Sequence, residues 1–111
     1  MIDCVFCNII NKTIESKILM ETEELIVIND ILPKAPVHML VVSKKHIISV
    51  NDLGPNDAVL SGNIIAAAKE MAKQAGISES GYKLVFNVGQ DGGQVIPHLH
   101  LHVMGGKNMG D

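Results

Sequence analysis

The sequence predicts one compact domain, residues 1–111, that combines several β-strands with a single long helix. Three observations support this expectation. The chain is 47% hydrophobic and 19% charged, so its 111 residues can bury a core of their own. Five short segments have the apolar clustering or alternation of strands. Only one stretch, between Gly54 and Gly76, repeats apolar residues at helical spacing over several turns.

The composition argues against several classes of protein. The formal net charge is −3, and Lys34, Lys44 and Lys45 are too few to form a surface for nucleic acid. No apolar run reaches 18 residues, so we expect no membrane span. The N-terminus lacks a basic region followed by an apolar stretch, so we expect no secretory signal and a cytoplasmic location, where thiols stay reduced.

The first half of the chain predicts three strands. Residues 17–21 and 24–29 are apolar segments joined by a short polar connection, which is typical of a hairpin. Residues 30–36 contain two prolines and are expected to form a loop. Residues 37–42 are apolar on both faces except at His38, which indicates a central strand.

A short helical turn and the long helix follow these strands. Ser43 is expected to cap the short turn. Pro55 and Asp57 favour the start of the long helix, and Gly76 favours its end. Its apolar face is rich in alanine, which predicts close packing on a sheet; the face comprises Leu60, Ile64, Ala67, Ala68, Met71 and Ala75.

The last third predicts two strands around a glycine-rich turn. The strands are residues 82–88 and 98–104. In the second of them, period-two alternation places three histidines on one face and three aliphatic residues on the other: His98, His100 and His102 against Leu99, Leu101 and Val103. The turn, residues 89–94, has two possible uses. It links antiparallel strands through glycines with positive φ, or its N–H groups bind an anion.

Three alternating histidines favour a site that uses imidazole. Neutral imidazole is a good nucleophile near pH 7, so one histidine would attack phosphorus while the other two, the turn and Asn87 surround the phosphoryl oxygens. Alternatively, two of the histidines hold a catalytic metal. A third possibility is a protein that binds a nucleotide or a metal without catalysis.

Cys4 and Cys7 are separated by two residues. In a reducing compartment, this spacing is typical of half a metal site or of a redox pair, and the plain alternative is two idle thiols. A zinc ion would need two further ligands, which the histidines can most conveniently supply.

The segment from His98 to Met104 matches the His-φ-His-φ-His-φ-φ signature of the histidine-triad (HIT) family, where φ is apolar. The resemblance covers nearly the whole chain, and further segments match the family in the same order: residues 4–7, 30–38, 44–46 and 91–94. Gly105-Gly106-Lys107 is similar to the tail of the Hint branch of the family, the nucleoside phosphoramidases. The resemblance implies an α+β fold, with an antiparallel sheet of about five strands crossed by one long helix. It also implies a homodimer in which the two sheets join.

The resemblance also implies roles for individual residues. His100 would attack the α-phosphorus of a purine nucleotide, and water would hydrolyse the nucleotidyl-histidine to the nucleoside monophosphate. His102 and His38 would complete the catalytic set. Asp30 would bind the ribose hydroxyls and Ile31 would contact the purine. Phosphate contacts would come from Asn87, Gly93, Gln94 and Val95.

We therefore expect a hydrolase or transferase that acts on purine nucleoside phosphoramidates or related nucleotidyl compounds. The first alternative is hydrolysis of dinucleoside polyphosphates, as in the Fhit branch of the family. The second is a nucleotide-binding regulatory module with weak catalysis. The Gly-Gly-Lys tail favours phosphoramidates over the first alternative.

Two further features follow from the resemblance. As in some members with an N-terminal Cys-x-x-Cys, the resemblance implies a closed tetrahedral zinc site, which is structural rather than catalytic. Its ligands here would be Cys4, Cys7, His46 and His98. Val95 is a departure, because many members carry Ser or Thr at this position. That hydroxyl assists the leaving group, so Val95 bears on rate and on leaving-group preference.

Overall fold

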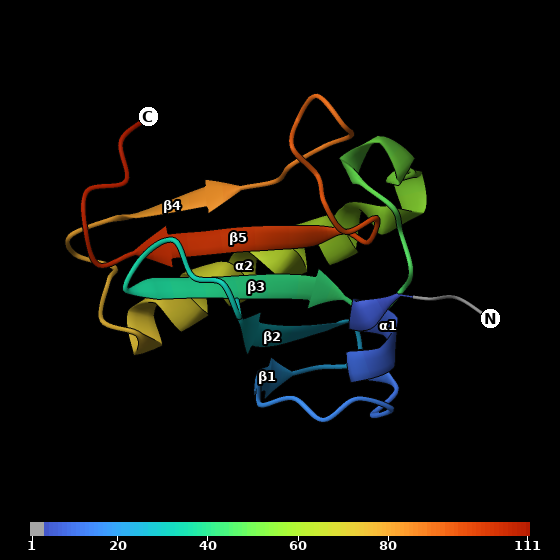
Figure 1. The fold of residues 1–111 in the computed structure, drawn as a ribbon. Helices are drawn as coiled ribbons and strands as arrows, with labels where there is room; N and C mark the ends of the chain where they lie inside the picture. The colour runs from blue at the N-terminus through green and yellow to red at the C-terminus, as the bar shows by residue number, and fades with distance from the viewer. Residues whose placement is uncertain (1–3) are drawn as a thin grey trace.

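A computed structural model describes residues 4–111 and contains a five-stranded antiparallel sheet crossed by a long helix (Figure 1). Residues 1–3 of the expected domain 1–111 lie outside the described residues. The α+β prediction is confirmed. The strand order is β1-β2-β3-β5-β4, and the strands are β1 (Ile18–Glu21), β2 (Leu25–Asn29), β3 (Val37–Ser43), β4 (Tyr82–Val85) and β5 (His100–Gly105). β1 and β2 form the predicted hairpin, and β3 is central, as its apolar faces predict.

Strand alternation builds one core on each face of the sheet. On one face, Val41 and Leu101 pack with residues of the long helix α2 (Ala58–Gln74). On the other face, Leu40 and Val42 pack with a short helix, α1 (Val5–Ile10). The three aliphatic residues of the histidine segment all belong to the core under α2, as their spacing predicts. The histidine side chains of β5 therefore face the α1 side.

The long helix follows the expected boundaries closely. A 3₁₀ turn, Pro55–Asp57, leads into α2, and Gly76 follows its end with a φ of 76°, the left-handed conformation that glycine adopts most easily. Of the predicted apolar face, Ala75 is exposed because it lies past the last helical residue, and Ala72 is buried in its place. Within residues 4–111, no helix is both long enough and apolar enough to cross a membrane.

The segment around Ser43 corrects one prediction. Ser43 caps no helical turn, because it is the last residue of β3 and its Oγ donates to the carbonyl of Lys45. The short helical turn lies later, at Val50–Asp52, where the Ser49 hydroxyl accepts from the Asn51 N–H.

Two strand boundaries differ from the sequence-based prediction by more than one residue. β4 ends at Val85 instead of residue 88, because its pairing with β5 stops at His102. β5 begins at His100 instead of residue 98. The two preceding residues bond elsewhere: the N–H of Leu99 donates to the Ile47 carbonyl, and that of His98 donates to the Ile96 carbonyl.

Candidate functional site

Three histidines gather on the α1 side of the two central strands. In the antiparallel register of β3 and β5, Leu40 is opposite His102 and Val42 is opposite His100, while His38 stands two residues before Leu40 on the same face. His38 and His100 are buried, and His102 is half-buried. The sheet register alone thus brings the three predicted histidines together.

His100 is held in one tautomer by the main chain. Its Nδ1 lies 2.6 Å from the carbonyl oxygen of His98, and because a carbonyl only accepts, Nδ1 must carry the hydrogen. In the neutral ring, Nε2 then carries the lone pair. The ring packs edge-on against Phe6 of α1 and against His102, with centroid separations of 5.1 and 5.0 Å. His100 therefore presents an unprotonated nitrogen, which is the nucleophilic form of imidazole.

His38 and His102 form a hydrogen-bonded pair whose direction is also fixed. The N–H of Lys34 donates to His38 Nδ1 at 3.0 Å, so the neutral ring of His38 carries its hydrogen on Nε2. This Nε2–H donates to His102 Nδ1 at 2.9 Å. The remaining nitrogen of neutral His102, Nε2, is consequently an N–H donor.

Burial keeps this pair uncharged. It lowers the pKa of His38, and together with the nearby His100 and His38 it lowers the pKa of His102 to about 4. Asp30 acts in the opposite direction: its Oδ2 lies 3.3 Å from His38 Nε2, and its negative charge raises both pKa values. At neutral pH the pair is therefore neutral, with one N–H available beyond it.

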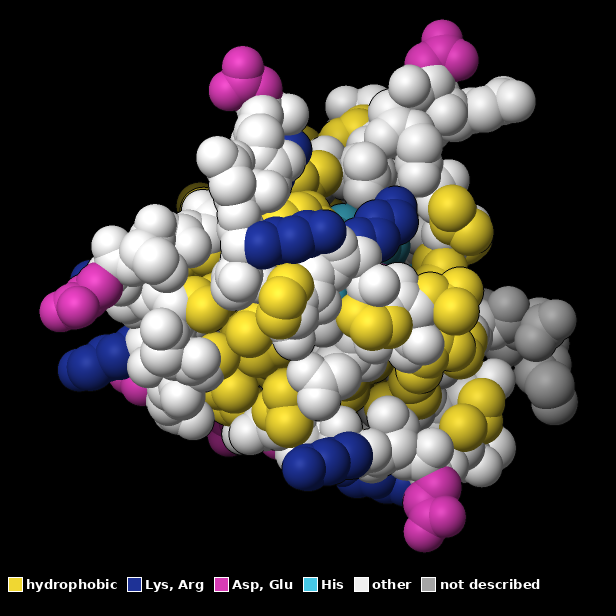
Figure 2. Space-filling model, turned by 60° about the vertical axis from the view of Figure 1, so that its left-hand side comes forward, with side chains coloured by type: hydrophobic (Ala, Val, Ile, Leu, Met, Phe, Trp, Pro, Cys, Tyr) yellow, Lys and Arg dark blue, Asp and Glu magenta, His cyan; other side chains and the backbone are white. Residues whose placement is uncertain are grey.

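A pocket of about 480 Å³ opens above these histidines. Its floor is largely apolar and includes Phe6, Ile9 and Leu40. Seven of the predicted site residues line it: Asp30, Ile31, Asn87, Gly93, Val95, His100 and His102. Figure 2 shows hydrophobic side chains gathered on this side of the molecule and histidine atoms visible beside two lysine side chains.

The rim of the pocket is formed by two loops. Ile31 is 91% exposed on the loop between β2 and β3, and Val95 is 89% exposed on the loop between β4 and β5. Lys34 is the one lysine among the described residues that line the pocket. The pocket thus combines an apolar floor, exposed apolar rims, the two carboxylates of Glu15 and Asp30, and one lysine.

Side-chain hydrogen bonds of Asn87 and Gln94 stabilise the glycine-rich turn. The side-chain amide of Asn87 donates to the Gly92 carbonyl at 2.8 Å, and that of Gln94 donates to the carbonyls of Ile48 and Ile96. The Gln94 side-chain oxygen accepts from the Gly89 N–H. Gln94 does not line the pocket, unlike the other predicted phosphate-binding residues. The turn does link two antiparallel strands, and its second possible use, anion binding, stays a prediction.

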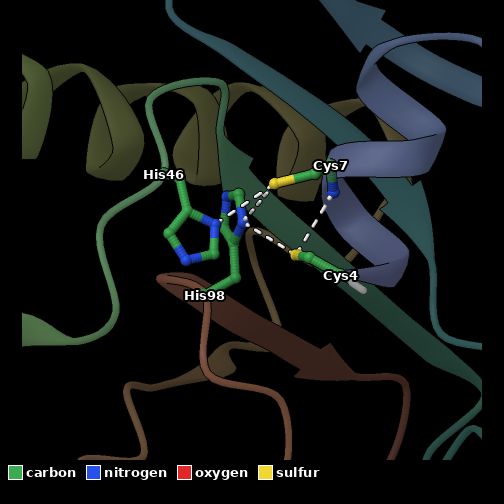
Figure 3. A group of neighbouring side chains, drawn as sticks. All are labelled: Cys4, Cys7, His46 and His98. Carbon is green, nitrogen blue, oxygen red and sulfur yellow. Dashed lines mark hydrogen bonds between the residues drawn. The ribbon is translucent and has the colours of Figure 1, made fainter. Parts of the chain in front are cut away.

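The predicted zinc ligands also converge (Figure 3). Cys4 and Cys7 come from the start of α1, His46 from the loop after β3, and His98 from the segment before β5. Their four ligand atoms all lie within 4.8 Å of one another. The closest contacts are Cys7 Sγ to His46 Nδ1 at 3.1 Å and Cys4 Sγ to His98 Nδ1 at 3.3 Å.

The hydrogens around this cluster suit a cation. His98 Nε2 lies 2.6 Å from the Ser43 carbonyl and must donate to it, which leaves Nδ1 with a lone pair facing both sulfurs. Burial and the neighbouring Cys4 raise the pKa of the Cys7 thiol to about 11, so a bound cation is needed to hold it as a thiolate at neutral pH. Two sulfurs and two imidazoles form a donor set that zinc prefers.

Sequence reasoning missed the contribution of α1. Phe6 and Ile9 form part of the pocket floor, and their spacing of three within a short apolar segment was the available signal. The main-chain carbonyls of Ser43 and His98, which orient two histidines, leave no signal in the sequence. The contact between Asp30 and His38 was also not anticipated.

Comparisons with known proteins agree on one group of relatives. A family model described as "Scavenger mRNA decapping enzyme C-term binding" matches residues 3–111. The purine nucleoside phosphoramidase of Escherichia coli (strain K12) is 35% identical over 108 residues, which cover 97% of this chain and 91% of that protein.

Solved structures give the same result. The HIT family hydrolase from Legionella pneumophila superposes with a TM-score of 0.95 and 42% identity, over 97% of this chain and 96% of that chain. A zinc-bound histidine triad family protein from Mycobacterium smegmatis superposes with a TM-score of 0.81 and 27% identity, over 96% of this chain and 77% of that one.

Proposed function

Because this chain belongs to the histidine-triad (HIT) family of hydrolases, we propose that it cleaves purine nucleoside phosphoramidates at the α-phosphorus through a nucleotidyl-histidine. The observation that carries the proposal is the tautomer of His100, whose Nδ1–H is bonded to the His98 carbonyl so that Nε2 is free to attack. The name of the E. coli relative supports the choice of phosphoramidates. Residues 1–111 would act as a single HIT domain.

The proposed reaction has two steps. In the first, His100 Nε2 forms a bond to phosphorus while the P–N bond of the substrate breaks, and the leaving amine takes a proton from solvent. In the second, water attacks phosphorus, the histidine–phosphorus bond breaks, and the proton returns to solvent with release of the nucleoside monophosphate. His102 Nε2–H donates to a phosphoryl oxygen in both steps, and His38 holds the His102 ring in place.

The rest of the pocket would position the nucleotide. Asp30 would accept hydrogen bonds from the ribose hydroxyls, and Ile31 and the apolar floor would contact the purine. The phosphate would lie against the glycine-rich turn and the histidines, with contacts from Asn87, Gly93, Gln94 and Val95. Among residues 4–111, Lys34 is the only lysine that lines the pocket, so most of the phosphate's partners would be N–H groups.

Cys4, Cys7, His46 and His98 would hold a structural zinc ion. When bound, such an ion ties the start of α1 to the segments before β5 and after β3 and supplies no chemistry to the reacting phosphorus. The fit rests on the lone pair of His98 Nδ1 and on the closeness of the four ligand atoms.

A homodimer is the proposed assembly, with the two sheets joined and the two α2 helices packed together. β4 is an edge strand, and its Leu84 is 39% exposed. On α2, Val59 and Ile65 are 71% and 51% exposed. Light scattering should give twice the 11.9 kDa chain mass, and Ile65→Glu should shift the protein towards monomer. A monomeric parent chain at micromolar concentration would rule the assembly out.

The experiment that tests the reaction is the capture of its intermediate. Rapid quench into alkali, in which the histidine–phosphorus bond is stable, during turnover of an adenosine phosphoramidate should give a protein heavier by one nucleotidyl group, which peptide fragmentation maps to His100. His100→Gly should lose the adduct, and added imidazole should restore some turnover without labelling the protein. Turnover of dinucleoside polyphosphates alone, or nucleotide binding with no turnover at all, would favour the two alternative functions instead.

A further inference from the structure

Asp30 is tied to the histidine pair as well as to the pocket. Its Oδ1 accepts from the Leu32 N–H at 2.8 Å, which fixes the carboxylate at the end of β2. Its Oδ2 lies 3.3 Å from Nε2 of His38, whose side chain is 1% exposed while that of Asp30 is 18% exposed. The carboxylate therefore has one side against a buried histidine and another side in the pocket.

The single hydrogen on His38 Nε2 bonds to one acceptor and lies near a second. The hydrogen bond goes to His102 Nδ1 at 2.9 Å, and Asp30 Oδ2 lies 3.3 Å from the same nitrogen as a charge contact. His38 cannot supply a second hydrogen, because the Lys34 N–H occupies Nδ1. A hydrogen bond from His38 to Asp30 would therefore form at the expense of the bond that orients His102.

We propose that Asp30 is a positioning residue that links occupancy of the ribose position to the orientation of His102. The inference rests on the proposed function, in which the ribose hydroxyls donate to Asp30. A carboxylate oxygen that accepts from a ribose hydroxyl competes less well for His38 Nε2–H. That hydrogen then goes fully to His102 Nδ1, which fixes His102 Nε2–H towards the phosphoryl group. In an empty pocket, or with a substrate that lacks ribose hydroxyls, Asp30 Oδ2 stays free to compete for this hydrogen.

The charges around the pair are consistent with this coupling. His38 faces Asp30, Lys34 and His102, and His102 faces His100, His38, Asp30 and Lys34. Asp30 is the only acidic group in this set. Its loss therefore removes both the competing acceptor and the only negative charge that acts on the two rings.

The kinetic test compares two matched adenosine phosphoramidates, one with ribose and one with 2′,3′-dideoxyribose. With the parent enzyme, the dideoxy substrate should lower kcat by roughly tenfold in addition to raising KM, because His102 stays poorly oriented. In Asp30→Asn, kcat should be the same for both substrates, because the amide competes weakly for the His38 hydrogen. Glu23→Gln, an exposed carboxylate-to-amide change with the same loss of charge, should keep the parent behaviour.

Two outcomes would overturn the proposal. The first is an unchanged kcat for the dideoxy substrate with the parent enzyme, so that the loss is confined to KM and Asp30 only binds ribose. The second is a tenfold difference in kcat that persists in Asp30→Asn. Similar melting temperatures for the variant and the parent would show that neither result reflects misfolding.

A binding measurement separates this proposal from the proposed reaction. ¹⁵N NMR of the histidine rings should show a shift of His102 Nδ1 when adenosine monophosphate binds, and a much smaller shift with the dideoxy monophosphate at equal saturation. The difference should vanish in Asp30→Asn. This result would stand even if no phosphoramidate were turned over, whereas equal shifts with both nucleotides would defeat the coupling and leave the reaction untouched.

Discussion

Two polar clusters of this protein are built alike and differ in where one hydrogen lies. Cys4, Cys7, His46 and His98 converge at the end of the sheet where β5 begins, and Asp30, His38 and His102 converge farther along the same two central strands. Both clusters place histidine nitrogens close to acidic side chains, which are thiols in the first and a carboxylate in the second. Their ligand atoms would satisfy the same distance requirement for a metal.

The hydrogens separate the two clusters. His98 donates its hydrogen outwards to the Ser43 carbonyl, so its lone pair faces the sulfurs and a bound ion would take the place of the thiol hydrogens. The Lys34 N–H occupies the outer nitrogen of His38, so the hydrogen of that ring points inwards at His102, with the Asp30 carboxylate beside it. One cluster is thus prepared for a cation and the other is a chain of hydrogen bonds. In each cluster, a main-chain group outside it sets the histidine tautomer: the Ser43 carbonyl for His98 and the Lys34 N–H for His38.

The largest expected effect is on turnover and comes from His100, which lies beside the hydrogen-bonded histidine pair. His100→Ala should lower turnover of an adenosine phosphoramidate by at least about 10³-fold, because the attacking nitrogen is lost. Its zinc content should not change, because His100 is not among the four ligand atoms. Steady-state kinetics and metal analysis on the same preparation would check both. A variant with parental activity would contradict the assignment of the nucleophile.

The next largest effect is expected at the proposed zinc site. Cys4→Ser should lose the bound zinc and melt at a lower temperature, while Asn8→Ser in the same helix should keep both properties. At a free zinc concentration one hundred times the dissociation constant, the ion would contribute about 2.7 kcal/mol to the free energy of unfolding. Scanning calorimetry with added zinc or chelator measures this contribution. Protein that purifies without zinc and melts identically with either addition would remove the proposed metal site.

A pH dependence distinguishes the clusters further. Burial lowers the pKa of His38, and that of His102 to about 4, so the unfolded chain binds more protons than the folded one below pH 6.5. The free energy of unfolding of the zinc-loaded protein should therefore be fully retained above pH 6.5 and fall steadily towards pH 4. The carboxyl groups of Glu21 and Asp57 are paired with lysines and have lowered pKa values. Their contribution to the free energy of unfolding is therefore lost only below about pH 4.5.

Urea unfolding at several pH values between 4.5 and 6.5 would isolate the histidine contribution. His102→Gln removes one of the two titrating groups and should flatten this slope. A stability that does not change across the interval, or a slope that the variant leaves intact, would show that the buried histidine pair is not its source.

The smallest effect is expected at the rim of the pocket. Val95→Ser should change the free energy of unfolding by less than about 0.5 kcal/mol, because the side chain is 89% exposed. Its effect on kcat should be less than about tenfold and should vary with the leaving amine, since a hydroxyl at this position can donate to it. Turnover of substrates with alkyl and aryl amines would check this. An equal effect on every amine would mean that Val95 does not contact the leaving group.

The sequence predicted most of the fold and most members of both clusters. Period-two spacing placed His100 and His102 on one face, and the resemblance to the family placed His98 with the cysteines, which the structure brings together. The α1 helix escaped prediction because six residues show less than two turns of helical periodicity. The true start of β5 escaped because Leu99 bonds to Ile47, a partner that only the tertiary structure supplies.

The hydrogen positions could not be predicted at all. Each depends on a main-chain atom, either a carbonyl of Ser43 or His98 or the N–H of Lys34, and any residue type offers the same carbonyl. Side-chain patterns therefore indicated which residues meet. They carried no information on which nitrogen of each ring is protonated, although the proposed chemistry depends on it.

The bond from His100 to residue 98 has a consequence for engineering. Because the acceptor is a peptide oxygen, every amino acid installed at position 98 brings it along. A substitution at position 98 can thus remove a metal ligand and still leave the His100 ring oriented, provided that the backbone conformation is unchanged.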